Sequence, residues 1–215
     1  MNSRYGFPTK PTIGKEDMTE LYLGWCKIGY MYGLKVLSKL DQKKYRQEFG
    51  CFVVEGKRGV LDAVLSRSSV LQLVVTESFL QQQKEYCQQP ALASFFDQKK
   101  VLTVSSSDFS QLTETVTPQG IAAVVSIPNY TLDVLKNGQL LVVLEDIRDP
   151  GNLGTMIRTA DWFGVDGVIL AGGADPYQPK VVRSSMGSLF HVPLFVSHNI
   201  LSEVSLLKNA GFQLV

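Results

Sequence analysis

The sequence predicts an α/β protein of 215 residues with two parts. Segments rich in aliphatic and β-branched residues alternate with segments of helical periodicity, which is the pattern of an α/β fold. Turn-forming residues interrupt this alternation at 128–138. We therefore expect an N-terminal extension at 1–32, a small α/β domain at 33–127, a linker at 128–138, and a second domain built on a parallel sheet at 139–215.

The first half of the chain divides into an irregular start and a regular domain. Residues 1–17 contain two prolines and lack the apolar run of a signal peptide. Apolar residues at helical spacing then predict a helix over 18–31. The same reasoning predicts the elements of the first domain, in order: helix 33–48, strand 51–55, helix 56–66, strand 70–76, helix 78–88, strand 101–105, helix 107–113 and strand 121–127.

The second domain alternates more regularly, which indicates a parallel sheet with right-handed crossovers. Asp149 followed by Pro150 fits an N-cap and the first position of a helix. Gly164 and Gly211 stand where helices end in the left-handed conformation. The expected strands are 140–145, 167–171, 192–196 and 212–215, with helices 150–163, 178–189 and 199–209 between them.

The composition excludes several classes of protein. Cys26, Cys51 and Cys87 are widely spaced and form no CxxC pair, so neither a disulfide framework nor a zinc site is expected. Reduced thiols are typical of a cytoplasmic protein. No apolar run approaches the roughly 18 residues of a membrane span. We expect a cytoplasmic protein that binds neither a membrane nor a metal.

The net charge of +1 conceals an uneven distribution. Residues 1–60 hold 11 Lys/Arg against 6 Asp/Glu, residues 61–135 hold 4 against 7, and residues 136–215 hold 6 against 7. Such clustering is typical of a surface that contacts a phosphate backbone, and a solvated helix face is the alternative explanation. The basic excess is concentrated in Lys35, Lys39, Lys43, Lys44, Arg46, Lys57 and Arg58.

The most informative stretch is 145–164, where a hydrophobic strand leads through a polar turn into a helix. Open α/β sheets place their ligands at such junctions. Asn152 and Gly154 lie in the first turn of this helix, where free backbone N–H groups favour anionic or polar ligands. Arg158 follows six residues after Asn152. It is either a functional cation or a surface arginine paired with Asp161 or Asp166.

Two further segments carry polar or small residues. Residues 181–193 are rich in Ser and Gly, which permits close approach of a ligand or simply helix–sheet packing. Ser185 lies in no GxSxG sequence, so it is not the nucleophile of a hydrolase elbow. The turn at Gly172-Gly173 follows a strand but is not the GxGxxG fingerprint of a dinucleotide site.

These residues carry a specific resemblance. The run 149–160, with Asn152-x-Gly154 and Arg158-x-Ala160, resembles motif 1 of the SpoU (TrmH-like) RNA 2′-O-ribose methyltransferases of the SPOUT superfamily. Residues 179–193 resemble motif 2 through Arg183, Ser185, Gly187 and Pro193. Residues 45–47 and 52–56 are similar to the ribosomal-protein-like, substrate-binding domain that precedes the catalytic domain in many members. The resemblance covers residues 33–215.

The resemblance implies transfer of a methyl group from S-adenosylmethionine to a ribose 2′-hydroxyl of rRNA or tRNA by a homodimer. Arg158 would orient the 2′-oxygen and stabilise its developing negative charge, and Asn152 would position Arg158 or the substrate. Ser185 would line the site or the subunit interface. The resemblance assigns RNA or substrate contacts to Lys43, Lys44, Arg46, Glu55, Arg183 and Ser185, and weaker cofactor contacts to Gly172 and Gly173.

The sequence also departs from the family pattern. The family's third motif supplies most of the cofactor pocket and the threaded tail of a trefoil knot, and no counterpart follows the fourth predicted strand. We expect the sequence to continue in a longer protein, and this polypeptide alone to bind S-adenosylmethionine poorly. Gln178 stands where an Asn is common. The alternatives are a catalytically inactive RNA-binding module and a small-molecule enzyme that uses the Gly172-Gly173 turn.

Overall fold

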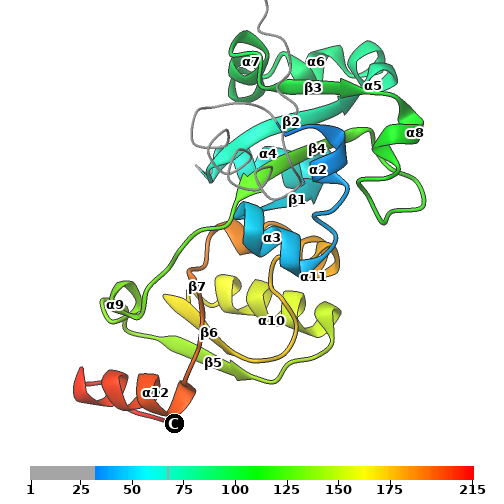
Figure 1. Cartoon of the computed structure of the whole chain (residues 1–215). Helices are drawn as coiled ribbons and strands as arrows, with labels where there is room; N and C mark the ends of the chain where they lie inside the picture. Colours follow the sequence, from blue (N-terminus) through cyan, green and yellow to red (C-terminus); the bar gives the residue numbers. More distant parts are fainter. Residues whose placement is uncertain (1–31, 67) are drawn as a thin grey trace, which may run out of the picture. The chain divides into compact units, whose positions relative to one another are not determined.

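The computed structural model describes residues 32–66 and 68–215, so the predicted helix over 18–31 lies outside the described residues. Residues 33–215 form one compact unit that contains two sheets (Figure 1). The first sheet has the strand order β1-β4-β2-β3 and the second has the order β5-β6-β7. The α/β class and the parallel second sheet are therefore confirmed.

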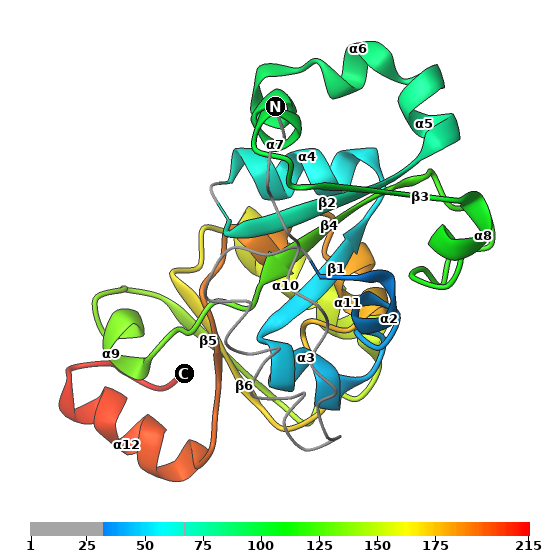
Figure 2. The ribbon, with the colours of Figure 1, turned by 45° about the horizontal axis from the view of Figure 1, so that its top comes forward.

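The first sheet is mixed. Its strands are β1 (Cys51–Glu55), β2 (Val70–Thr76), β3 (Val101–Val104) and β4 (Ile121–Ser126). Strand β4 pairs antiparallel with β1 and β2, and β2 pairs parallel with β3. Helix α4 (Lys57–Leu65) packs against β1, β4 and helix α7 (Pro90–Asp97) (Figure 2). All four predicted strands of the first domain form.

Three predicted helices of the first domain were too long. The prediction of one helix over 33–48 was wrong: α2 (Leu34–Leu37) and α3 (Lys43–Phe49) are separated by turns, because the Leu40 and Asp41 carbonyls accept hydrogen bonds from Arg46 instead of continuing a helix. The helix over 78–88 breaks at Gln83, whose ψ is 40°. Its parts are α5 (Glu77–Gln82) and α6 (Lys84–Cys87).

Short elements account for the remaining differences in the first half. The predicted helix over 107–113 is a single turn, α8 (Ser106–Phe109), capped by the Ser105 hydroxyl. Helix α7 was not predicted, although Pro90 at its first position is a recognised start signal. One helical turn, α9 (Leu132–Leu135), lies within the expected linker.

The second sheet is parallel and covered on both faces. Its strands are β5 (Leu141–Glu145), β6 (Gly167–Ala171) and β7 (Leu194–Val196). Val168 and Leu170 of β6 join the core that includes helices α10 (Pro150–Trp162) and α11 (Pro179–Ser184). Ile169 points the other way, into a cluster with Leu135 of α9 and Leu207 of α12 (Ile200–Asn209).

Two predictions for the second domain were wrong. The helix over 178–189 ends at Ser184, because Met186 and Gly187 adopt positive φ values of 52° and 94° before a short 3-10 helix, η1 (Ser188–Phe190). The segment 212–215 forms no strand. Phe212 packs on the cluster around Leu207, while Leu214 and Val215 stay exposed, so this segment buries too little surface to hold a strand in place.

The helix-end predictions were confirmed. The Asp149 carboxylate accepts a hydrogen bond of 2.8 Å from the Asn152 backbone N–H, and Pro150 occupies the first position of α10. Gly164 and Gly211 have φ values of 66° and 100° and end α10 and α12 in the left-handed region. Within the described residues, no helix is both long and apolar enough to cross a membrane.

Gly154 sets the close approach of α10 and α11. A Cβ atom at this position would overlap the Ser184 hydroxyl and lie 2.8 Å from the Val181 carbonyl oxygen. The side chain could rotate away, but the carbonyl belongs to the backbone of α11 and cannot. The two helices are therefore packed as a fixed pair behind the second sheet.

We expect Gly154→Ala to lower the free energy of unfolding by about 2 kcal/mol, because overpacking forces the two helices apart. Urea denaturation measures this change. Thr155→Ala is the matched control, since its exposed side chain points away from α11, and its effect should stay within about 0.5 kcal/mol. Equal stability of the two variants would contradict the close packing.

Candidate functional site

The loops that follow β5 and β6 are joined at the carboxyl edge of the second sheet. The Asp146 N–H donates to the Ala171 carbonyl at 2.9 Å, and the Ala174 N–H donates to the Ile147 carbonyl at 2.8 Å. A Cβ on Gly173 would lie 2.7 Å from the Ile147 nitrogen, so only glycine permits this contact. The predicted ligand edge of an α/β sheet is thus a defined pair of loops.

The residues of this edge are polar and exposed. Arg148 forms an ion pair of 2.6 Å with Asp146, and its guanidinium lowers the pKa of that carboxyl. Asn152 lies in the first turn of α10 with an exposed side chain. Gly172 is exposed in the adjacent loop, has a φ of 73°, and has open space where a Cβ would be.

The loop after β7 is held by a buried carboxylate. Glu203 of α12 accepts hydrogen bonds from the backbone N–H groups of His198 and Asn199, at 3.1 and 3.3 Å. Burial raises the pKa of the Glu203 carboxyl, but hydrogen bonds from Ser197, His198 and Asn199 outweigh that effect and lower the pKa overall. Sequence reasoning did not identify this residue, which organises the third loop of the same edge.

Arg158 lies on the exposed face of α10. Among the residues that the structure describes, its guanidinium has no hydrogen-bond or ion-pair partner. The two acids that sequence offered as partners are engaged elsewhere. Asp161 contacts the His191 ring at 3.3 Å, and Asp166 accepts from the Gln139 and Leu140 N–H groups, which lower its pKa. The guanidinium is therefore available to a ligand.

Asn152 does not hold Arg158 through a hydrogen bond. Six residues separate the two, which is roughly 9 Å along an α-helix axis. The backbone N–H of Asn152 is used by the Asp149 cap, and its side chain is exposed. Positioning of the substrate, the other role that the resemblance implies for Asn152, stays a prediction.

Ser185 is fully buried, and its hydroxyl donates to the Val182 carbonyl at 2.9 Å. It therefore faces the protein core rather than the surface of this chain. Arg183, on the exposed side of α11, donates to the Glu114 carboxylate at 3.0 Å. That pair connects α11 to the long loop that precedes β4.

Arg46 is the residue whose position differs most from a surface contact. Its side chain is only 3% exposed and forms a bidentate pair with Asp175, at 3.0 Å from Nε and 2.6 Å from Nη2. Nη1 donates to the Leu40 and Asp41 carbonyls at 2.7 and 2.6 Å. The guanidinium is saturated inside the protein and joins α3 to the loop after β6.

Aromatic packing surrounds this ion pair. The other oxygen of Asp175 accepts from the Tyr177 N–H at 3.1 Å. The Tyr177 ring lies 5.0 Å from the Phe52 ring of β1, and burial raises the pKa of its hydroxyl. Phe52 belongs to the first sheet and Tyr177 to the segment before α11, so the two parts share one hydrophobic core.

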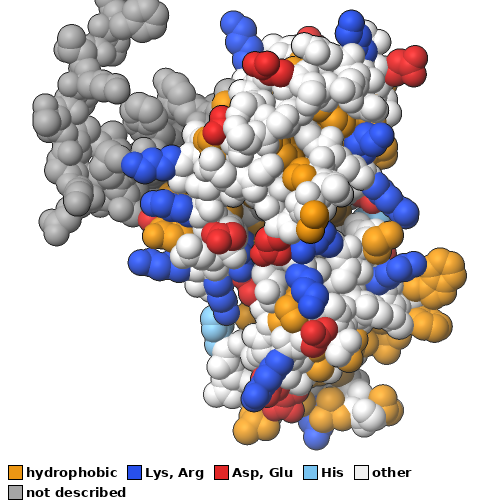
Figure 3. Space-filling model, turned by 90° about the vertical axis from the view of Figure 1, so that its right-hand side faces the viewer, with side chains coloured by type: hydrophobic (Ala, Val, Ile, Leu, Met, Phe, Trp, Pro, Cys, Tyr) orange, Lys and Arg blue, Asp and Glu red, His pale blue; other side chains and the backbone are white. Residues whose placement is uncertain are grey.

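The exposed lysines form a smaller cluster than the sequence suggested. Lys43 and Lys44 are exposed on α3. The Lys39 and Lys44 ammonium groups lie 5.0 and 5.7 Å from the Tyr45 ring centre. Figure 3 shows Lys and Arg side chains spread over one whole face, interspersed with Asp and Glu. The basic surface is therefore local, with an aromatic ring at its centre.

A cavity of about 240 Å³ lies where the first part meets α11. It is lined by Glu55, Arg58 and Asp62 from the first part and by Arg183 and Met186 from the second. Glu55 also accepts a hydrogen bond of 2.7 Å from Thr115. Of the predicted residues, this cavity brings together Glu55 and Arg183. Within the described part of the chain, no cluster of His, Cys, Asp and Glu could hold a metal ion.

Comparison with known families matches the two parts separately. Residues 139–215 match the model of the SpoU rRNA Methylase family, and residues 33–123 match the MRM3-like substrate binding domain.

Comparison with individual proteins agrees. The 23S rRNA (guanosine(2553)-2'-O)-methyltransferase RlmP of Bacillus subtilis is 38% identical over 179 residues, which cover 83% of this chain and 66% of the relative. A TrmH-family structure from Porphyromonas gingivalis has a TM-score of 0.67 and 32% identity, covering 83% of this chain and 67% of its own. An AdoMet-bound rRNA methyltransferase from Sinorhizobium meliloti has a TM-score of 0.68 and 31% identity, covering 84% and 66%.

The chain is shorter than the proteins it matches. It spans less than two thirds of the Bacillus relative, and under two fifths of the vertebrate mitochondrial rRNA methyltransferases that also match.

We expect Arg46→Met to lower the free energy of unfolding by about 3 kcal/mol, because Asp175 would keep a largely buried charge without a partner. Urea denaturation tests this, with Arg148→Met as the control for an exposed ion pair, where the loss should be below about 1 kcal/mol. The double variant Arg46→Met/Asp175→Asn should lose less than the sum of the single variants. Additive losses would show that the two residues are not coupled.

Proposed function

This chain belongs to the SpoU family of rRNA methylases, and from that premise we propose that it acts in transfer of a methyl group from S-adenosylmethionine to a ribose 2′-hydroxyl of RNA. The observation that carries the proposal is the unpartnered Arg158 guanidinium on α10, the helix that leaves the carboxyl edge of the second sheet. Within the described residues it is exposed and has no acidic partner, as a group reserved for a substrate requires.

The residues at the carboxyl edge fit a cofactor of this kind. Gly172 is exposed, with a positive φ and open space beside it, so a ligand can approach its backbone closely. Gly173 instead serves to dock its loop on Ile147. S-adenosylmethionine supplies the electrophilic methyl group. The AdoMet-bound structural relative supports this cofactor. Gly172 is thus the better candidate for a cofactor contact.

Arg158 would act by charge rather than as a base. A guanidinium stays protonated in proteins, so it cannot remove the proton of a hydroxyl. It can donate hydrogen bonds to the 2′-oxygen and stabilise the negative charge that develops there. The absence of a competing carboxylate keeps this donor capacity free. We assign Arg158 the role of orienting and polarising the nucleophile.

The RNA contacts would come from the first part of the chain. Lys43 and Lys44 are exposed and flank the Tyr45 ring, which suits phosphate contact beside an unstacked base. Arg46 is saturated by Asp175 and has a structural role. We propose rRNA as the substrate class, because the named relatives act on rRNA and the first part matches a substrate binding domain.

We expect Arg158→Ala to lower the rate of methyl transfer by about 10²–10³-fold, the usual loss for one transition-state donor, while RNA affinity changes little. The test uses the longest protein that carries this sequence, with tritiated S-adenosylmethionine and rRNA. Arg148→Ala is the control, because it removes an exposed arginine from the neighbouring loop. Undiminished transfer by the Arg158→Ala protein would exclude the assigned role.

We also propose that the chain forms a homodimer through α10. This helix ends in two large exposed hydrophobic side chains, Trp162 at 85% and Phe163 at 73% exposed, and Met156 is 39% exposed one to two turns earlier. Large exposed apolar patches mark association surfaces, and a two-fold dimer places the same patch on both subunits. A second copy of the chain is the occupant that this arrangement favours.

Sedimentation velocity at tens of micromolar protein should therefore give twice the 23.8 kDa mass of the chain. Trp162→Ser combined with Phe163→Ser should give the monomer mass. Leu201→Ser, which removes a 79% exposed side chain from α12, is the control and should leave the dimer intact. A monomeric unmodified protein would contradict the proposal.

A further inference from the structure

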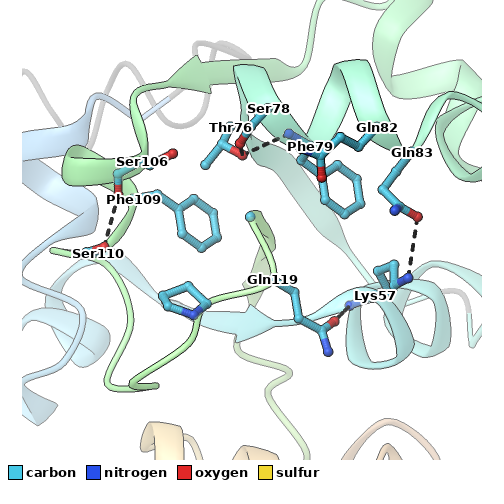
Figure 4. Close-up of a pocket in the computed structure, with 12 residues that line it drawn as sticks. Lys57, Thr76, Ser78, Phe79, Gln82, Gln83, Ser106, Phe109, Ser110 and Gln119 are labelled. Carbon is cyan, nitrogen blue, oxygen red and sulfur yellow. Dashed lines mark hydrogen bonds between the residues drawn. The ribbon is translucent and has the colours of Figure 1, made fainter.

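A polar cavity of about 360 Å³ opens at one edge of the first sheet, where β2 ends and β4 begins (Figure 4). Its floor is formed by the rings of Phe79 and Phe109, which are almost fully buried. Its walls carry hydroxyl and amide groups and one ammonium group, that of Lys57. Neither the sequence motifs nor the proposed methyl transfer accounts for this cavity.

Two glycines build the cavity wall. Gly56 and Gly120 have φ values of 89° and 81°, and they turn the chain out of β1 and into β4. A Cβ on Gly120 would lie 2.6 Å from the Thr76 hydroxyl. These turns place Lys57 next to Gln119, whose side-chain oxygen accepts from the Lys57 backbone N–H at 2.8 Å. The two residues are thus fixed side by side by the backbone.

Lys57 is a cation without a counter-ion among the described residues. Its side chain is half-buried, and its ammonium makes one long hydrogen bond, 3.4 Å, to the neutral Gln83 oxygen. No carboxylate lines the cavity. An ammonium has three donors and no acceptor, so at least two of its hydrogen bonds point to something other than these protein groups. The matching ligand carries acceptors or negative charge.

We propose that this cavity receives an unstacked nucleobase of the RNA substrate, with preference for a base that carries a ring carbonyl, guanine or uracil. This inference rests on the proposed RNA function. The cavity volume is within the range of small-ligand sites. Single-stranded RNA is read by hydrogen bonds to the edges of splayed bases, and lysine prefers carbonyl and ring-nitrogen acceptors. The amides of Gln82 and Gln83 can complete the base edge, and the phenylalanine floor covers its apolar part.

The cavity also leads toward the second part of the chain. Gln119 lines both this cavity and the 240 Å³ cavity that holds Glu55 and Arg183. An RNA strand with one base in the first cavity can therefore continue over Gln119 toward α11. The base site would fix the register of the strand, and the exposed lysines of α3 would contribute affinity without sequence preference.

The test measures fluorescence anisotropy of the whole chain with labelled 12-nucleotide RNA probes: oligo(U), oligo(A), oligo(C), and oligo(A) with one central guanine. We expect tighter binding of the uracil and guanine probes than of the others. Lys57→Met should weaken binding of those two probes about 10-fold, the loss of one good base contact, and abolish the preference. Ser106→Phe, which fills the cavity without changing charge, should do the same.

Two controls separate the possible outcomes. Lys84→Met removes the same charge from an exposed position that does not line the cavity, and it should keep the base preference. Lys43→Met/Lys44→Met should weaken all probes equally. If the unmodified chain shows no base preference, or if Lys57→Met retains it, the base site is refuted while RNA binding stands. If no probe binds even at low salt, the RNA function itself is contradicted. Thermal melting of each variant confirms that it folds.

Discussion

The pairing of Arg46 with Asp175 is the interaction on which the arrangement of the two parts depends. The acid stands in the loop after β6, and the arginine stands on a helix beside the first sheet. Burying one charge without the other is strongly unfavourable, so each residue requires the position of the other. Around this pair, Tyr177 packs on Phe52 and Arg183 reaches Glu114. The base cavity and the catalytic loops are thereby held within one unit rather than on two mobile domains.

The same pair explains where sequence reasoning succeeded and where it could not. Strands and helix caps depend on local periodicity and on single residues such as Asp149 and Gly164, and these were predicted. Charge patterning grouped Arg46 with the surface lysines, because a one-dimensional pattern does not show that Asp175 waits 129 residues later. The break in the first predicted helix has the same cause, since the Leu40 and Asp41 carbonyls are used by that guanidinium.

The candidate site was partly predictable for a related reason. Arg158 was identified by its motif, and its exposure without a described partner could be learned only from the structure. The burial of Ser185 could not be read from its sequence, because the positive φ values at Met186 and Gly187 bend the segment away from a regular helix. Lys57 was counted among basic residues, but its distinction lies in the neutral groups around it.

The long sequence separation of Arg46 and Asp175 has a consequence for how the protein is made. A ribosome releases the arginine well before the acid, so the nascent first part carries an unmatched cation at its future junction. Contacts between distant segments also form slowly, because a large loop must close first. We infer that the first sheet assembles early and that the emergence of β6 is the step that locks the molecule. Translation speed over 129 residues thus becomes part of its folding problem.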